Sequence, residues 1–198
     1  MTEHLSKEYW EQRYADGTTG WDMGVVAPAL KQYFDSIEPK DAAILIPGCG
    51  NAWEAKYLVE QGFTNITVID IAEPPVNHLR EALGADAQQQ CNVVLGDFFA
   101  HAGKYDYIIE QTFFCAIDPA LRPAYVKHMA QLLKPKGELA GLLFKTPFDK
   151  PGPPYGGTEA EYREVFAGSL NLIEMISCEH SHPARAGNEL FFRAGLLS

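Results

Sequence analysis

The sequence lacks the features of membrane and secreted proteins. No apolar run among its 198 residues approaches the roughly 20 residues that span a bilayer. Residues 1–9 are polar and offer no apolar core for a signal peptide. The four cysteines are widely separated and form no CxxC pair, so we expect reduced thiols. These absences predict a protein that stays in the cytoplasm.

Positive charge is also scarce. The chain has 16 Lys and Arg residues against 26 Asp and Glu residues, a formal net charge of −10. Nucleic-acid phosphates and anionic lipids carry the same sign, so we expect neither a nucleic-acid partner nor a membrane partner. Small neutral or cationic ligands suit this charge better. No feature of the sequence indicates an oligomeric state.

One short segment has the composition of a metal site. In Cys178-Glu179-His180-Ser181-His182, alternate side chains would share one strand face and could supply three ligands. No fourth ligand group stands out elsewhere, and Pro183 follows directly. We therefore expect a polar strand end that runs into a turn, and no metal.

Short β-branched runs alternate along the chain with longer amphipathic stretches. This alternation is typical of a parallel sheet covered by helices on both faces. The predicted strands are Ala42–Pro47, Ile66–Ile71, Asn92–Leu95, Tyr105–Gln111, Gly137–Phe144, Asn171–Ser177 and Leu190–Gly195. The predicted helices are Lys7–Tyr14, Ala29–Asp35, Ala52–Gln61, Pro75–Leu83, Pro119–Leu133 and Glu159–Leu170.

The last two predicted strands are joined by a short polar segment, residues 179–189. It leaves no room for a crossover helix, so these strands should pair antiparallel. With 46% hydrophobic residues, the chain can bury one sizeable core. We predict an α/β fold with a doubly wound, seven-stranded, mostly parallel sheet whose last strand is antiparallel. It forms a single domain over residues 1–198, with residues 1–40 as an N-terminal helical lid.

A glycine-rich loop, Gly48-Cys49-Gly50, follows the first predicted strand. Open parallel sheets bind ligands beyond the carboxyl ends of their strands, near the point where strand order reverses. Glycines in such a loop let the backbone approach a ligand closely. A dinucleotide fingerprint would need a third glycine where Trp53 stands, which argues against NAD.

Acidic residues end the next two predicted strands. Asp70, 20 residues after Gly50, can accept hydrogen bonds from both hydroxyls of a ribose. Asp97 can accept from an adenine amino group while Phe98 packs on the base; alternatively, Asp70 is a turn residue and Asp97 a helix cap. Taken together, the loop and the two acids predict an adenosine pocket that needs no phosphate site.

Further motifs run along nearly the whole chain. They are Trp10-Glu11, Gly20-Trp21-Asp22-Met23-Gly24, Pro47-Gly48-Cys49-Gly50, Asp70-Ile71, Asp97-Phe98, Phe113-Phe114-Cys115-Ala116-Ile117, Arg122-Pro123-Ala124, Leu133-Lys134-Pro135 and Gly152-Pro153-Pro154-Tyr155. With them the chain resembles the thiopurine methyltransferase family, most closely its thiol and halide methyltransferase branch. The resemblance implies the Rossmann-like fold of class I methyltransferases, S-adenosylmethionine as methyl donor and a small-molecule acceptor.

The resemblance also implies the donor contacts by matching position. Two of these positions depart from plant relatives, which commonly have tryptophan in place of Tyr14 and tyrosine in place of Gln111. The implied contacts are Trp10, Tyr14, Trp21, Gly48, Asp70, Asp97, Phe98 and Gln111.

Methyl transfer from a sulfonium needs alignment in a water-poor pocket more than it needs acid or base chemistry. A soft acceptor such as a thiol, hydrosulfide, thiocyanate or halide needs little or no general base, because a free thiol is already partly ionised. Aromatic side chains can exclude water and attract the sulfonium. The candidates for this role, each of which could instead be a core residue, are Trp10, Trp21, Phe113, Phe114 and Tyr155.

Three residues are candidates for the acceptor side, and Tyr155 ranks first among them. Glu110 could bind the donor's amino group or orient the acceptor, or be a strand-end carboxylate that faces solvent. Arg122 could attract an anionic acceptor, or form a salt bridge on a helix surface.

Two alternative functions stay open, while a third is disfavoured. The Tyr14 and Gln111 departures are compatible with a donor-binding protein that no longer catalyses, and the acceptor could be another kind of small molecule. Base amino methylation is disfavoured, because the [DN]PPY element of those enzymes follows the fourth strand, whereas Pro153-Pro154-Tyr155 follows the fifth here.

Overall fold

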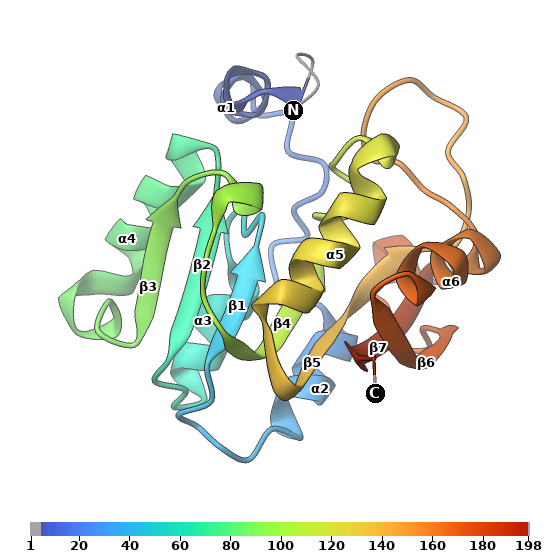
Figure 1. The fold of residues 1–198 in the computed structure, drawn as a ribbon. Coiled ribbons are helices and arrows are strands. Elements are labelled where there is room, and N and C mark those ends of the chain that lie inside the picture. The colour runs from blue at the N-terminus through green and yellow to red at the C-terminus, as the bar shows by residue number, and fades with distance from the viewer. Residues whose placement is uncertain (1–4, 198) are drawn as a thin grey trace. The chain divides into compact units, whose positions relative to one another are not determined.

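The computed structural model describes residues 5–197, and its helices and strands are drawn in Figure 1. The chain divides into two compact units, Met1–His101 and Ala102–Ser198. Each is described separately below. No helix among the described residues is long and apolar enough to cross a membrane.

The first unit contains three strands and four α-helices. Strand β2 pairs in parallel with β1 on one side and with β3 on the other, and β1 is buried along its whole length (Figure 1). In chain order its elements are α1 (Lys7–Ala15), α2 (Pro28–Asp35), β1 (Ile44–Pro47), α3 (Trp53–Glu60), β2 (Ile66–Asp70), α4 (Glu73–Ala87), β3 (Cys91–Leu95) and the 3-10 turn η2 (Phe98–Ala100). Because the strands are parallel, their carboxyl ends, which carry Gly48, Asp70 and Asp97, lie at the same edge.

The second unit contains four strands and two α-helices. Strands β4 and β5 are parallel, and β7 lies between β5 and β6 and runs antiparallel to both. In chain order the elements are β4 (Tyr105–Gln111), the 3-10 turn η3 (Pro119–Leu121), α5 (Arg122–Leu132), β5 (Leu133–Phe144), α6 (Glu159–Ala167), β6 (Leu170–Ser177), the 3-10 turn η4 (Pro183–Arg185) and β7 (Glu189–Leu196). The antiparallel pairing predicted for the last two strands is confirmed.

Most strands begin and end within two residues of the prediction, but β5 begins four residues earlier than expected. Its first residue, Leu133, pairs with Tyr105, and the register then shifts before pairing resumes between Glu138 and Tyr107. A Cβ on Gly137 would lie 2.8 Å from the Tyr105 carbonyl oxygen. The Lys-Pro-Lys-Gly segment is therefore a bulge inside the strand, where only glycine allows this close approach.

Candidate active site

The loop after β1 repeatedly adopts the left-handed backbone conformation. Gly48 (φ 58°), Gly50 (φ 51°) and Ala52 (φ 51°) alternate with residues of ordinary conformation. A Cβ on Gly50 would also lie 3.3 Å from the Tyr14 hydroxyl and 3.7 Å from the indole nitrogen of Trp21. The backbone conformation thus favours glycine at position 50, and an added methyl group would press against the end of the Tyr14 side chain.

Asp70, the last residue of β2, holds this loop in place. Its Oδ2 accepts a hydrogen bond from the Gly50 amide at 2.9 Å, and its Oδ1 accepts one from the Ala72 amide at 2.9 Å. Burial raises the pKa of this carboxyl, against the effect of the backbone hydrogen bonds. A carboxylate has about four lone-pair sites, so two amide bonds leave it capacity to accept from a ligand. Asp70 thus makes the turn contact that its alternative interpretation predicts, and it also bonds the loop after β1.

Three aromatic residues from the N-terminal segment gather beside the loop. The ring of Trp21 meets the edges of Trp10 and Tyr14 at centroid distances of 5.6 Å each. The indole of Trp21 hydrogen-bonds the Tyr14 hydroxyl, whose pKa is raised by burial and by the charge of Asp70. Helix α1 buries none of its residues and is capped by Ser6, the residue before it, whose side chain accepts from the Tyr9 amide. Its Trp10 and Tyr14 are thus only partly buried, as suits side chains that contact a ligand.

Asp97 and Phe98 follow β3. Asp97 Oδ1 accepts from the Phe99 amide at 2.9 Å, so the helix-cap interpretation of Asp97 is correct. This cap uses one oxygen of the carboxylate and does not exclude a ligand contact. The ring of Phe98 is 4% exposed and meets Phe99 edge to face.

In the second unit, Glu110 is a fully buried carboxylate near the end of β4. Its Oε1 accepts from the amides of Phe113 and Phe114 at 2.8 Å each, and its Oε2 accepts from the Tyr125 hydroxyl at 2.6 Å. Burial raises the pKa of Glu110 to about 7, although these three bonds oppose the shift. The interpretation of Glu110 as a solvent-facing residue is wrong, because the side chain is 0% exposed.

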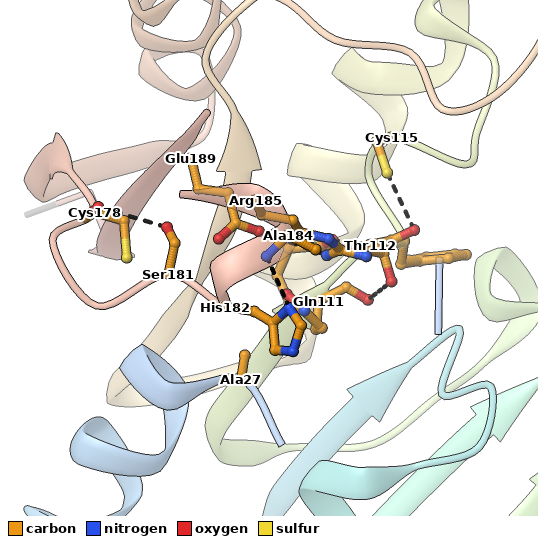
Figure 2. Close-up of polar contacts among 12 residues, drawn as sticks. Ala27, Gln111, Thr112, Cys115, Cys178, Ser181, His182, Ala184, Arg185 and Glu189 are labelled. Atoms are coloured by element: carbon orange, nitrogen blue, oxygen red, sulfur yellow. Dashed lines mark hydrogen bonds and ion pairs between the residues drawn. The ribbon is translucent and has the colours of Figure 1, made fainter. Parts of the chain in front are cut away.

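The residues after Glu110 form a tight turn, which Figure 2 shows. Thr112 is left-handed (φ 58°), its hydroxyl donates to the Gln111 carbonyl at 2.7 Å, and the Cys115 thiol donates to the Thr112 carbonyl at 3.3 Å. Burial raises the pKa of Cys115 to about 12, so it is a neutral thiol. The side-chain oxygen of Gln111 is buried and has no hydrogen-bond partner within the described residues. Gln111 thus presents an unused acceptor.

Phe114 belongs to the core. It is 0% exposed and packs against Tyr125, Tyr162 and Phe166 at centroid distances of 5.1, 5.6 and 6.0 Å. This packing corrects its interpretation as a wall of the methyl-transfer pocket. Phe113 is partly buried and keeps that possibility.

Tyr155 and Arg122 are brought together by the backbone. The Tyr155 amide donates to the Cys115 carbonyl at 2.7 Å, which joins the FFCAI and GPPY motifs. Nη2 of Arg122 donates to the carbonyls of Tyr155 and Gly156 at 3.1 and 3.0 Å, and the guanidinium lies 4.6 Å from the Phe114 ring centroid. Arg122 is 8% exposed, so the surface salt bridge is wrong as an interpretation. Its guanidinium fixes the loop that carries Tyr155.

A sequence model of the family described as Thiopurine S-methyltransferase (TPMT) matches residues 5–190. The chain belongs to the thiopurine S-methyltransferase family. It is therefore an S-adenosylmethionine-dependent methyltransferase, as its motifs predicted.

Curated relatives of this family member include two plant enzymes. It is 31% identical to "Probable thiol methyltransferase 2" of Arabidopsis thaliana, covering 91% of this chain and 81% of the relative. It is also 31% identical to "Thiocyanate methyltransferase 1" of Brassica oleracea, covering 96% of this chain and 85% of the relative.

Solved structures confirm the fold of the family member. A 1,6-didemethyltoxoflavin-N1-methyltransferase of Burkholderia thailandensis, crystallised with its acceptor and S-adenosylhomocysteine, matches 97% of this chain and 87% of its own with a TM-score of 0.75 at 20% identity. A TehB-like methyltransferase of Corynebacterium glutamicum matches 96% and 98% with a TM-score of 0.68 at 16% identity. The predicted Rossmann-like methyltransferase fold, with seven strands that are mostly parallel, is confirmed.

Two residues of this methyltransferase escaped the sequence-based assignment of roles. Asp22 accepts hydrogen bonds from Trp53 and Asn51, next to the Gly48-Cys49-Gly50 loop (called the donor loop below). Arg185 is 7% exposed, lies 3.5 Å from Glu189 in an ion pair and sits 5.4 Å from the Phe144 ring centroid. Asp22 stands in the Gly-Trp-Asp-Met-Gly motif, which signalled its importance, whereas nothing local in the sequence marked Arg185 as buried.

The Cys178 to His182 segment has a structural task at its end. Nδ1 of His182 accepts from the Ala184 amide at 3.2 Å and caps the 3-10 turn η4 (Figure 2). The Ser181 hydroxyl donates to the Cys178 carbonyl at 3.5 Å. Among residues 5–197, no group of three or more His, Cys, Asp or Glu side chains is arranged to hold a metal ion.

Proposed function

We propose that the protein transfers the methyl group of S-adenosylmethionine to a small soft nucleophile: a thiol, hydrosulfide, thiocyanate or halide. The similarity over 96% of the chain to a thiocyanate methyltransferase carries this proposal. We further propose that it acts in the cytoplasm as a single domain over residues 1–198, with residues 1–40 as a lid and without a nucleic-acid or membrane partner. The net charge of −10 supports the last point.

The residues of the first unit fit the adenosine part of the donor. The carboxylate of Asp70 would accept from the ribose hydroxyls, for which it has lone pairs left, and Gly48 would allow close backbone approach. Asp97 would accept from the adenine amino group, beside the ring of Phe98. Asp70 is the strongest of these assignments, because it also sets the loop conformation.

The methionine part of the donor calls for a different set of residues. When bound, S-adenosylmethionine supplies a methyl group attached to a positively charged sulfonium. The partly buried rings of Trp10, Tyr14 and Trp21 would attract that charge, each by roughly 0.5 to 2 kcal/mol where a ring face is presented. The unused side-chain oxygen of Gln111 would accept from the donor's ammonium group.

On the acceptor side, Tyr155 would contact the nucleophile, and Arg122 and Glu110 would act by position. Arg122 holds the Tyr155 backbone, and Glu110 holds the amides of the Phe113 turn. The Arg122 guanidinium and the Glu110 carboxylate are thus already engaged in hydrogen bonds to the backbone. A soft nucleophile fits this arrangement, because a thiolate, thiocyanate or halide needs no proton removed by the protein.

The test is a product assay with methyl-labelled S-adenosylmethionine and a panel of thiols, hydrosulfide, thiocyanate, iodide, a phenol and an amine. We expect labelled product from at least one soft acceptor and none from the phenol or the amine. Calorimetry on the same preparation measures donor binding separately. Donor binding with no product from any acceptor would show a silent binding protein, and product from the phenol or amine alone would show a different acceptor class.

A further inference from the structure

One carboxylate ties the N-terminal segment to the donor loop within the first unit. Asp22 Oδ1 accepts from the indole nitrogen of Trp53 at 2.7 Å, and its Oδ2 accepts from the side-chain amide of Asn51. Oδ1 also accepts from the Gly24 amide at 2.8 Å, which closes a turn around Asp22. The carboxylate therefore bridges two segments that lie about thirty residues apart in the chain.

The environment keeps this carboxylate ionised. Its partial burial acts to raise the pKa, but hydrogen bonds from Gly24, Trp53 and Asn51 outweigh burial and leave the pKa of Asp22 below its ordinary value. The ammonium of Lys56 lies 4.3 Å from the Trp53 ring centroid and helps to hold that ring.

Both ends of the bridge are next to residues that face the donor loop. Trp21 precedes Asp22, and its indole nitrogen lies 3.7 Å from the position of a Cβ on Gly50. Asn51 follows Gly50 directly, and Trp53 starts helix α3 just beyond. A second and weaker tie, from the Ala27 amide to Glu54 at 3.5 Å, joins the same two segments.

We propose that Asp22 is a positioning residue that fastens Trp21 and Tyr14 over the Gly48-Cys49-Gly50 loop before the donor arrives, through its hydrogen bonds to Trp53 and Asn51. Such preassembly strengthens donor binding, because none of the binding free energy is then used to order Trp21 and Tyr14. The inference rests on the proposed donor site. It also gives a task to Trp53, the residue that excluded a dinucleotide fingerprint.

Trp53→Phe tests the proposal, because it keeps a smaller aromatic ring near Lys56 and removes the indole N–H that donates to Asp22. Tyr57→Phe is the matched control. Tyr57 belongs to helix α3, as Trp53 does, and its hydroxyl donates to Asp35 of helix α2, away from the donor loop. We expect Trp53→Phe to weaken calorimetric donor binding roughly 10-fold, as for the loss of one hydrogen bond to a charged group. The control should bind the donor as the wild type does.

Two further readouts separate positioning from general stability. In the ligand-free protein, backbone amides of residues 18–24 should exchange hydrogen faster in Trp53→Phe than in the control. In turnover, the KM for the donor should rise while kcat at saturating donor stays within about twofold. Asp22→Asn should weaken donor binding more than Trp53→Phe, and the double variant should be no weaker than Asp22→Asn alone.

Unchanged donor affinity in both Asp22→Asn and Trp53→Phe would overturn the proposal. So would equal amide exchange in residues 18–24 of Trp53→Phe and Tyr57→Phe. If the proposed donor site itself is wrong, the result is distinguishable, because the wild type and Tyr57→Phe would then also bind no S-adenosylmethionine.

Discussion

Two strand-end carboxylates, Asp70 in the first unit and Glu110 in the second, both accept backbone amides and differ in their burial. Each accepts two amide hydrogen bonds that shape a loop, at 2.8 to 2.9 Å. Glu110 also accepts from the Tyr125 hydroxyl at 2.6 Å and is 0% exposed. Asp70 is only partly buried and its two oxygens share two amide donors. The Glu110 carboxylate is thus enclosed in the core of its unit, whereas the Asp70 carboxylate stays partly exposed beside the loop after β1.

The same contrast applies to the two loops. The loop after β1 is held from one side by Asp70, and its other side faces Tyr14 and Trp21. The turn after β4 is held by Glu110, a residue of the same strand, and packs Phe114 into the core. The first loop therefore contacts aromatic side chains of the N-terminal segment, whereas the second packs a ring into the core of its own unit.

The largest effect is expected for Asp70→Ala. In the proposed donor site this change removes two hydrogen bonds to ribose hydroxyls, each worth about 1.5 to 3 kcal/mol when the acceptor is charged, so donor affinity should fall by roughly 100-fold or more. Calorimetric titration with S-adenosylmethionine measures this, and thermal unfolding confirms that the variant is folded. Asp106→Asn is the control, because this half-exposed carboxylate lies in the second unit and pairs with Lys134. Equal donor affinity in the two variants would remove Asp70 from the donor site.

Glu110→Gln should change the pH dependence of stability. The pKa of Glu110 is about 7 in the folded protein and near its ordinary value when unfolded, so the folded state holds the proton more tightly. The contribution of Glu110 to the free energy of unfolding should therefore be greatest below pH 4.5. It should fall by on the order of 3 kcal/mol as the pH rises through 7.

The neutral amide of Gln can still accept from the two backbone amides and donate to Tyr125. Urea unfolding at pH 5 and pH 8.5 should thus show the variant losing less stability over this range than the wild type. A pH dependence identical to that of the wild type would mean that Glu110 titrates near its ordinary pKa.

Arg122→Met should separate the acceptor side from the donor side. The variant keeps the aliphatic stem but loses the bonds to the Tyr155 and Gly156 carbonyls, at a cost of about 2 kcal/mol in the free energy of unfolding. The KM for the acceptor should rise about 10-fold, while donor affinity measured by calorimetry should not change. Arg193→Met is the control, because it also removes a guanidinium of the second unit, one that pairs with Glu138 and Glu174 on the sheet instead of with loop carbonyls. A fall in donor affinity would show that Arg122 does not act through Tyr155 alone.

The fold was predictable because its determinants are local. Strand β4 spans Tyr105–Gln111 as predicted, since a β-branched run bounded by polar residues marks it on its own. The early start of β5 was not predictable, because it depends on the close approach of Gly137 to the Tyr105 carbonyl across the sheet. Such contacts join residues about thirty positions apart and leave no periodic trace in the sequence.

In the candidate site, too, local features could be predicted from the sequence and long-range contacts could not. Sequence position could place Asp70 at a strand end beside a glycine loop, and the structure puts its carboxylate on the Gly50 amide. It could not show that Tyr125, fifteen residues later, uses up the carboxylate of Glu110, or that Arg122 binds carbonyls more than thirty residues away. A strand end can be read from the sequence, whereas the number of partners around a side chain cannot.

The smallest expected effect, from Gly50→Ala, tests the proposed role of the loop after β1 in donor binding. Alanine in the left-handed conformation costs about 1 kcal/mol, so the free energy of unfolding should fall by about that amount. Gly62→Ala is the matched control, because Gly62 also has a positive φ, 83°, and an added Cβ would meet nothing within 4 Å. Both variants should lose similar stability in urea unfolding. Only Gly50→Ala should also weaken donor binding, because its methyl group would lie 3.3 Å from the Tyr14 hydroxyl and push the aromatic wall outward. Equal donor affinity in the two variants would mean that the contact between Tyr14 and the loop has no part in holding the donor.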